Sequence, residues 1–310
     1  MNRPLHPCID PACVDCRGDG FLLVRDGERA RAEPCGCLER YIHPQCPDCG
    51  GKGFVAVKGS EERKMRCPCR GRCPICRGSG FVAEDPSDHF SRRRRCTHGG
   101  LGEALARFNR AGLPARFAAA ASAPFRHRDE AQLVALSSAL AVLRDFDRTV
   151  DNRGLVLHGP VGRGKTHLLA FLVRRLIFEK RATVRFVEFS HLLADLKASF
   201  DRGTPAAALV DPLVEVDVLV VDELGKGRCT EWELTVIDEL VSRRYNAGRA
   251  VLASTNFEPG AATGRRTPNN AMPAERVTLA DRVGERVYSR LREVCEFVDM
   301  PGSDYRRPMT

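Results

Sequence analysis

A glycine-rich turn between an apolar run and a helical pattern is the feature that most constrains the fold of this chain. The apolar run is Leu155-Val156-Leu157, and the helical pattern extends from His167 to Lys180. The turn itself consists of Gly159, Pro160, Val161, Gly162, Arg163, Gly164, Lys165 and Thr166. A strand, a glycine-rich turn and a helix in this order are the setting of a phosphate-binding loop. The glycines let backbone N–H groups face phosphate oxygens, and the helix N-terminus adds partial positive charge.

Residues 159–167 are therefore the expected nucleotide contacts, with ATP and Mg²⁺ as cofactors. Lys165 is expected to reach the β- and γ-phosphates, and Thr166 is expected to hold Mg²⁺. The alternative is a chance glycine-rich turn, which the flanking strand and helix patterns disfavour.

Cysteine usage divides the chain. Twelve of the 14 cysteines precede residue 97, and only Cys229 and Cys295 follow it. We expect a metal-binding region over 1–100, a linker and lead-in over 101–128, and a larger domain over 129–310. The chain shows neither a secretory signal nor an apolar run long enough to cross a membrane, so we expect a cytoplasmic protein with reduced thiols.

The first hundred residues contain three copies of one pattern. Each copy opens with Cys-x-x-Cys-x-Gly-x-Gly-Phe and closes with two ligand-type residues one position apart, after nearly equal gaps. The expected zinc ligands are Cys13, Cys16, Cys35 and Cys37 in the first copy, Cys46, Cys49, Cys67 and Cys69 in the second, and Cys73, Cys76, Cys96 and His98 in the third.

The apolar segment after each Cys-x-x-Cys predicts a strand, at Phe21–Val24, Phe54–Val57 and Phe81–Ala83. So little apolar material predicts three small β-hairpins that need zinc to fold. An iron–sulfur cluster is the alternative metal group. Cys8 and His43 fall outside the pattern and are interpreted as spare surface residues.

The opening motif resembles the zinc region of DnaJ-type chaperones, but the chain has no His-Pro-Asp signature, so cochaperone activity is not implied. The repeat is expected to dock a protein or a nucleic acid.

Zinc also changes the charge argument. Three zinc ions on eleven thiolates would lower the formal net charge of +9 to about +4, so net charge alone does not predict a polyanion partner. The cluster Arg92-Arg93-Arg94-Arg95 remains a candidate phosphate contact, or else a solvated run of charge in a linker.

Strand and helix patterns alternate in the rest of the chain. A helix is expected over 129–146, and strands over Leu155–His158, Thr183–Phe189, Asp217–Asp222, Ala250–Ser254 and Glu296–Asp299. Continuous apolar strands between helices predict an α/β fold with a parallel sheet that helices cover on both faces.

Three polar residues at the strand ends complete a candidate hydrolytic site. Asp222 is expected to hold Mg²⁺, directly or through water, and Glu223 to polarise the attacking water. Asn256 is expected to orient that water, with a simple turn cap as the alternative.

One helix is expected over Leu279–Glu293, which places Arg282, Arg286 and Arg290 on one face. Such a face is usually only solvated, but an arginine from one subunit can enter the site of a neighbour in an oligomeric ATPase.

The phosphate loop, the Asp-Glu strand and the Ser254-Thr255-Asn256 strand end together resemble the AAA+ class of P-loop ATPases. Residues 108–117, 284–293 and 303–306 are similar to segments of its DnaC/DnaI helicase-loader and IstB transposition-helper branch. The resemblance covers roughly residues 105–307.

The resemblance implies further roles. Arg290 is the first choice for the arginine that acts in a neighbouring subunit and Arg286 the second, while Arg306 would sense the γ-phosphate in its own chain. Members of the branch thread single-stranded DNA along interior helices, for which Ser190–Phe200 with Lys197 is the best match. Phe200 is equally explained as a core residue. The polar segment Ala261–Val277 departs from the branch and is expected to be a flexible loop.

These features favour a helicase loader, a homo-oligomer when ATP-bound that carries the replicative helicase and binds single-stranded DNA. The second hypothesis is a transposition or phage-recombination helper that coats duplex DNA and recruits a transposase. The third is a zinc-module adaptor with a slow nucleotide switch, against which Asp222, Glu223, Asn256 and Arg290 argue.

Overall fold

The computed structural model of the 310-residue chain divides into two compact units. The first contains residues 1–26 and 31–109, and the second contains residues 27–30 and 110–310. The structure describes residues 8–40, 46, 48–50, 52, 54–57, 60–67, 81–83, 93–95, 99–202, 207–228, 230–260, 277–302 and 304–305. No described helix is long and apolar enough to cross a membrane.

The first hundred residues contain three two-stranded sheets. They are formed by β1 (Phe21–Asp26) with β2 (Arg29–Pro34), β3 (Phe54–Val57) with β4 (Ser60–Arg66), and β5 (Phe81–Ala83) with β6 (Arg93–Arg95). The pairs β3–β4 and β5–β6 are antiparallel, and the short helix α1 (Cys37–Arg40) follows β2. Each sheet therefore follows one Cys-x-x-Cys motif, as the repeat predicts. Three of the four clustered arginines form strand β6 rather than a linker.

A five-stranded parallel sheet forms the centre of the second unit. Its order is β11 (Cys295–Asp299), β7 (Gly154–His158), β10 (Ala250–Ser254), β9 (Val218–Asp222) and β8 (Val184–Glu188). Every residue of β7, β9 and β10 is buried, because these strands lie inside the sheet with helices on both faces. The predicted α/β fold with a covered parallel sheet is confirmed.

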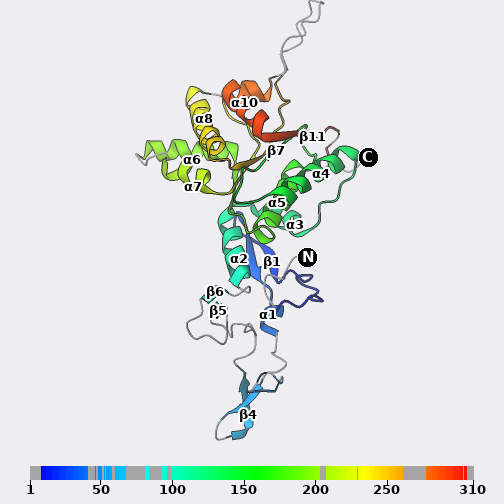
Figure 1. The fold of residues 1–310 in the computed structure, drawn as a ribbon. Coiled ribbons are helices and arrows are strands. Elements are labelled where there is room, and N and C mark those ends of the chain that lie inside the picture. Colours follow the sequence, from blue (N-terminus) through cyan, green and yellow to red (C-terminus); the bar gives the residue numbers. More distant parts are fainter. Residues whose placement is uncertain are drawn as a thin grey trace, which may run out of the picture. The chain divides into compact units, whose positions relative to one another are not determined.

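Figure 1 shows α3 (Ala118–Ser122), α4 (Glu130–Asp145) and α5 (Lys165–Phe178) together on one side of this sheet. On the other side lie α6 (Phe189–Asp201), α7 (Ala207–Glu215), α8 (Glu231–Asn246) and α10 (Glu285–Val294). The apolar cluster under this second group includes Leu196, Ile237 and Leu291. The carboxyl ends of the parallel strands meet at one edge, which brings loops distant in sequence together.

The expected connector before the sheet is largely helical. It contains α2 (Gly99–Ala111), the 3₁₀ turn η1 (Ala115–Phe117) and α3. Pro114, with an extended backbone at φ −62° and ψ 143°, is the last residue between the end of α2 and the start of η1. Alanine is the best helix former, which explains why this alanine-rich segment does not remain irregular.

The single helix expected over Leu279–Glu293 is wrong. Gly284, at φ 85° and ψ 147°, separates α9 (Leu279–Val283) from α10. Only glycine adopts this conformation without strain, so the chain changes direction there. Arg282 consequently does not share a face with Arg286 and Arg290. It donates hydrogen bonds to the carbonyl oxygens of Gly225, at 2.8 Å, and Gly227.

Candidate nucleotide-binding and metal sites

The glycine-rich turn joins the end of β7 to the start of α5, in the predicted order of strand, turn and helix. Gly159, Gly162 and Gly164 all have positive φ angles, of 128°, 79° and 86°. A Cβ atom at Gly159 would lie 2.7 Å from the carbonyl oxygen of Met300, and one at Gly162 would overlap Asp304. Glycine is therefore required both by the backbone conformation and by the segment that packs on the turn.

Lys165 is buried at the first position of α5 and directs its ammonium group back over the turn. Its Nζ donates hydrogen bonds to the carbonyl oxygens of Gly159 and Pro160, both at 2.7 Å, and to Oδ1 of Asn256 at 2.8 Å. These acceptors are neutral, so a negatively charged phosphate would be a stronger partner for the ammonium group. The structure thus brings together Lys165 and Asn256, which the sequence places on separate motifs.

Thr166 and Asp222 form the predicted magnesium pair. Thr166 Oγ1 donates to Asp222 Oδ1 at 2.9 Å, and the Ser254 hydroxyl donates to the same carboxylate oxygen. Burial raises the pKa of Asp222, while the hydrogen bonds from Ser254 and Thr166 oppose that shift. Hydroxyl and carboxylate oxygens are the ligands that Mg²⁺ prefers, so this pair fits the ion.

Glu223 directly follows β9 with a left-handed backbone, at φ 55°. Its N–H donates to Ser254 Oγ at 3.1 Å, which fixes the backbone beside Asp222. Its carboxylate forms an ion pair with Lys226, whose Nζ also lies 3.8 Å from Glu188 Oε1. A positive φ in a non-glycine residue costs free energy, and such residues concentrate at functional sites.

The Arg163 side chain is anchored by residues outside the glycine-rich turn. Its side chain is 1% exposed, forms an ion pair with Asp129 and donates from Nε to the Met300 carbonyl oxygen at 3.3 Å. Its guanidinium carbon lies 4.4 Å from the ring centre of Tyr305. The amide of Gln132 also donates to the Arg163 carbonyl oxygen at 2.8 Å. These contacts tie the turn to the start of α4 and to the chain after β11.

The sequence reasoning missed Asp129, Gln132 and Lys226. Asp129 is the N-cap of α4, which its position before the helical pattern could have indicated. Lys226 lies three residues after Glu223, a spacing that could have suggested contact across a turn. Tyr305 lies in the segment used for the family resemblance, but its contact with Asp129 could not be read from the sequence.

We predict that Asp129→Asn lowers the free energy of unfolding by about 2 kcal/mol at pH 7. This is less than the 3–5 kcal/mol typical of a broken buried pair, because the Asp129 side chain is 34% exposed. Asparagine keeps the N-cap, so the loss isolates the charge. Denaturant unfolding measures it.

The effect should depend on pH, because hydrogen bonds from Arg163 and Tyr305 lower the pKa of Asp129 from 3.8 to about 2. Because the pKa of Asp129 is lower in the folded state, its carboxylate stabilises the fold at pH values above 3.8, the ordinary pKa. This stabilisation is lost as the pH falls from 3.8 toward 2. The difference between wild type and variant should shrink in that window. The control Asp145→Asn removes an exposed pair at the other end of α4 and should change stability by less than about 0.5 kcal/mol. An equal loss in both variants would contradict the anchoring role.

The remaining loop residue, His167, packs its ring edge-on against Phe117, with ring centres 5.4 Å apart. The two candidate arginines on α10 share Asp238. Arg290 donates to Asp238 Oδ1 at 2.7 Å and its side chain is 26% exposed, whereas Arg286 lies 3.8 Å from Oδ2 and is 79% exposed. Arg306 and the segment 261–276 lie outside the described residues, as does the side chain of Phe200.

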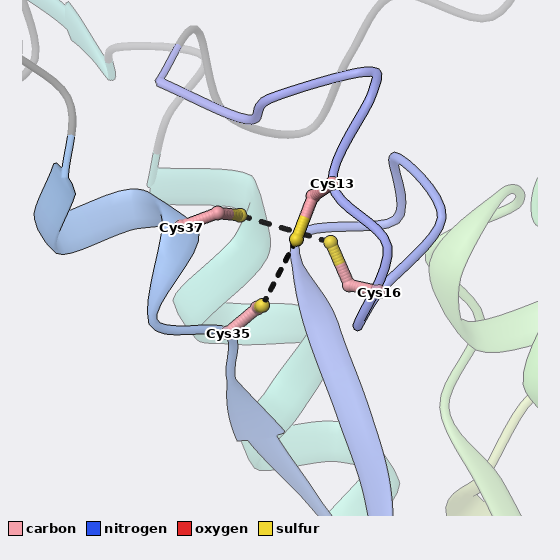
Figure 2. Close-up of side chains that lie close together, drawn as sticks. All are labelled: Cys13, Cys16, Cys35 and Cys37. Carbon is pink, nitrogen blue, oxygen red and sulfur yellow. Dashed lines mark hydrogen bonds between the residues drawn. The ribbon is translucent and has the colours of Figure 1, made fainter.

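The first cysteine set converges on one point, although two members precede β1 and two follow β2 (Figure 2). The Sγ atoms of Cys13 and Cys35 are 3.7 Å apart, as are those of Cys16 and Cys37. Tetrahedral zinc with Zn–S bonds of about 2.3 Å requires sulfur separations of about 3.8 Å. Burial raises the pKa of Cys37 to about 12, which a bound cation would offset. Spacing and donor chemistry therefore fit zinc.

The second set brings Cys46, Cys49 and Cys67 within 4.8 Å of one another. Its fourth expected ligand, Cys69, lies outside the described residues, as do all four ligands of the third set: Cys73, Cys76, Cys96 and His98. Cys8 is 2% exposed, so its interpretation as a surface residue is wrong. None of the described cysteines takes part in a disulfide bond.

Comparison with known proteins finds one family model that matches part of this chain. Residues 107–260 match the model of the IstB-like ATP-binding protein family, and the cysteine repeat lies outside this match. The replicative helicase loader DnaC of Escherichia coli (strain K12) is 27% identical over 188 residues, which are 60% of this chain and 68% of DnaC. A putative ATP-binding protein in an insertion sequence of Mycobacterium tuberculosis (strain ATCC 25618 / H37Rv) is 30% identical over 54% of this chain and 60% of that protein.

Among solved structures, that of the DnaC helicase loader superposes with a TM-score of 0.50 and 26% identity, covering 60% of this chain and 98% of that structure. Both comparisons with DnaC cover 60% of this chain. Residues 107–260 therefore form an IstB-like ATP-binding domain, which supports an ATPase, and the chain is homologous to the DnaC helicase loader.

Proposed function

We propose that this protein is a helicase loader that binds single-stranded DNA and delivers a replicative helicase under the control of ATP. The observation that carries the proposal is the joint presence of a DnaC-like ATPase and a separate cysteine-rich unit. ATP hydrolysis needs no residue of the cysteine-rich unit, so we assign to this unit the surface that binds the helicase. We place this activity in the cytoplasm, where thiols stay reduced and available for zinc.

The ATPase cycle follows from the site residues. Lys165 leaves its neutral acceptors for the β- and γ-phosphates, and Thr166 with Asp222 holds Mg²⁺, which neutralises phosphate charge when bound. Glu223 accepts a proton from the attacking water, and Asn256, released by Lys165, orients that water. All the residues used in these steps already lie within hydrogen-bond distance of one another or at the ends of adjacent strands.

A second subunit would complete the site. We assign Arg290, or else Arg286, to the γ-phosphate of the neighbour, with Arg306 acting within its own chain. Arg286 is favoured for this role because its side chain is more exposed, whereas Arg290 is favoured because Asp238 fixes its orientation. ATP would therefore favour a homo-oligomer, and hydrolysis would loosen it and release the helicase.

The test is to mix the zinc-loaded full chain and ATP with the replicative helicase of the same organism and to measure the mass of the complex. A stable complex that requires ATP, and that is lost in a Cys13→Ser/Cys16→Ser variant, is the expected result. Lys165→Ala is the control for nucleotide dependence. Absence of a complex under all these conditions would reject the loader function.

The second candidate is a transposition helper, favoured by the IstB-like family match and by the relative within an insertion sequence. In that case ATP-bound oligomers would form on duplex DNA and recruit a transposase. The two candidates differ in DNA preference. Sedimentation with single-stranded and duplex DNA of equal length would separate them, since a loader should favour the single strand.

A further inference from the structure

A groove of about 600 Å³ is lined by Lys226 and by residues of α6 and α8. These two helices lie on the same side of the sheet (Figure 1). Leu193 and Ala194 of α6 form part of its apolar lining, and the segment before α8 forms the opposite wall. The groove is distinct from the phosphate loop, which lies at the start of α5. The proposed hydrolysis cycle uses none of the residues that line it.

The groove combines cations with one aromatic ring. Lys197, Lys226 and Arg228 line it together with Trp232, which is 38% exposed and is the single tryptophan of the chain. Among the described residues, neither Lys197 nor Arg228 forms an ion pair with a carboxylate. A cationic groove with an accessible aromatic ring suits a nucleic-acid strand, because phosphates pair with the cations and a base stacks on the ring.

Two acidic groups also line the groove, Asp201 and Glu233. Glu233 is engaged at the N-terminus of α8, where its carboxylate accepts from the Thr230 N–H at 3.2 Å and Thr230 Oγ1 accepts from the Glu233 N–H. The positive end of the α8 dipole offsets part of that charge. The cations therefore outnumber the acids, and one acid already has a backbone partner.

Lys226 connects this groove to the proposed hydrolytic site. It lines the groove with a side chain that is 57% exposed, and its Nζ donates to Glu223 Oε2. The hydrogen bond from Lys226 to Glu223 raises the pKa of Lys226, so its ammonium form is favoured. The ammonium group occupies an acceptor site of Glu223 Oε2 and so competes with the attacking water for this carboxylate.

The backbone around Lys226 is held in place from the other side. Arg282 donates to the carbonyl oxygens of Gly225 and Gly227, and its guanidinium carbon lies 5.0 Å from the ring centre of Phe257. The Lys226 N–H also donates to the Glu223 carbonyl oxygen at 3.0 Å, which closes a tight turn. With the backbone fixed, the flexible part is the Lys226 side chain, which reaches both Glu223 and the groove.

We infer that this groove binds single-stranded nucleic acid, with a base on Trp232, and that a backbone phosphate draws Lys226 away from Glu223 and so releases the base for hydrolysis. Lys226 is thus a positioning residue that makes ATP turnover depend on the bound strand. The inference rests on the proposed role of Glu223. No covalent step is involved, since only the hydrogen-bond partner of Lys226 changes.

The first experiment titrates the zinc-loaded full chain, with Mg²⁺ and a non-hydrolysable ATP analogue, with a dT oligonucleotide while tryptophan fluorescence is recorded. Because the chain has a single tryptophan, the signal comes from Trp232, which lines this groove. We expect saturable quenching. We also expect Arg228→Gln to weaken oligonucleotide binding severalfold and to reduce its salt dependence, with turnover in the absence of DNA unchanged.

The second experiment measures ATP turnover with and without dT. In the wild-type protein, the oligonucleotide should raise the rate of ATP turnover. In the absence of DNA, Lys226→Gln should turn over ATP faster than wild type does. Adding DNA should then raise the turnover of this variant only slightly. A purely structural role for Lys226 would lower turnover instead. Lys197→Gln is the matched control, since Lys197 lines the groove but does not pair with Glu223. It should weaken binding and keep the stimulation at saturating dT.

Three results would overturn the inference. They are oligonucleotide binding without a change in tryptophan fluorescence, normal DNA stimulation in Lys226→Gln, and quenching by an acidic peptide but not by dT. Each is distinct from a failure of the proposed function. If Glu223→Gln keeps normal turnover, the role of Glu223 is wrong, whereas an inactive Glu223→Gln with a normally stimulated Lys226→Gln rejects only the role of Lys226.

Discussion

Replacing Glu223 with glutamine is expected to lower ATP turnover by about 10²–10⁴-fold while ATP binding is retained. Glutamine has nearly the same shape and can still accept a hydrogen bond from Lys226, but its amide cannot take a proton from water. The hydrogen bond to Ser254 Oγ uses the backbone N–H of Glu223 and not its side chain, so the left-handed turn should persist. Single-turnover hydrolysis and equilibrium nucleotide binding, measured on the same preparation, separate the two effects.

Two controls define this result. Glu188→Gln alters the carboxylate at the end of the adjacent strand, paired in register with Asp222, and should change turnover by less than about tenfold. Lys165→Ala should instead abolish nucleotide binding, because no other described lysine bridges the turn and Asn256. Normal turnover by the Glu223 variant would show that another group serves as the base.

Removing zinc is expected to unfold the cysteine-rich unit and to leave the ATPase unit folded. Structural zinc contributes about 10–16 kcal/mol to small metal-dependent domains, and this unit has little other apolar material to bury. The four sulfur atoms of the first set also surround a single point, which a cation must occupy to offset thiolate repulsion. Metal analysis should give three zinc ions per chain, and chelation should expose the unit to protease.

A cysteine substitution tests the sites individually. Cys35→Ser should lower the zinc content from three ions to two and should render residues 8–40 sensitive to protease. Cys229→Ser is the control, since Cys229 lies outside the repeat and should leave the zinc content at three. Visible absorption typical of iron–sulfur clusters in the purified protein would reject zinc as the metal.

The sheet and the phosphate loop were the easiest parts to predict. Strands β7, β9 and β10 are continuous apolar runs, and such runs are recognisable because both faces are buried. The glycine spacing of the loop follows from local backbone conformation, which depends on few neighbours. The hairpins of the cysteine repeat were similarly accessible, since metal ligands recur at fixed positions around each strand pair.

Prediction failed where a single backbone conformation or a distant contact decides the outcome. Helical periodicity extended through Gly284, whose φ of 85° ends α9 and separates Arg282 from the arginines of α10. Arg163 lies within the loop of expected nucleotide contacts, but the sequence did not reveal that Asp129 binds its charge. The partners of Arg282 and Arg163 have no local signal in the sequence, because these side chains meet their partners only after the sheet has formed.

The sequence by itself determined which residues can bind phosphate and metal, since glycine, lysine, carboxylate and thiolate chemistry is local and its spacing survives without a structure. It also determined the parallel α/β architecture, through apolar strands that alternate with helices. Only the tertiary structure decided the partners of charged side chains that lie far from them in sequence: Lys165 on Asn256 and Arg163 on Asp129. The physical reason is that parallel strands bring their carboxyl ends to one edge, where residues far apart in sequence compete for the same few charges.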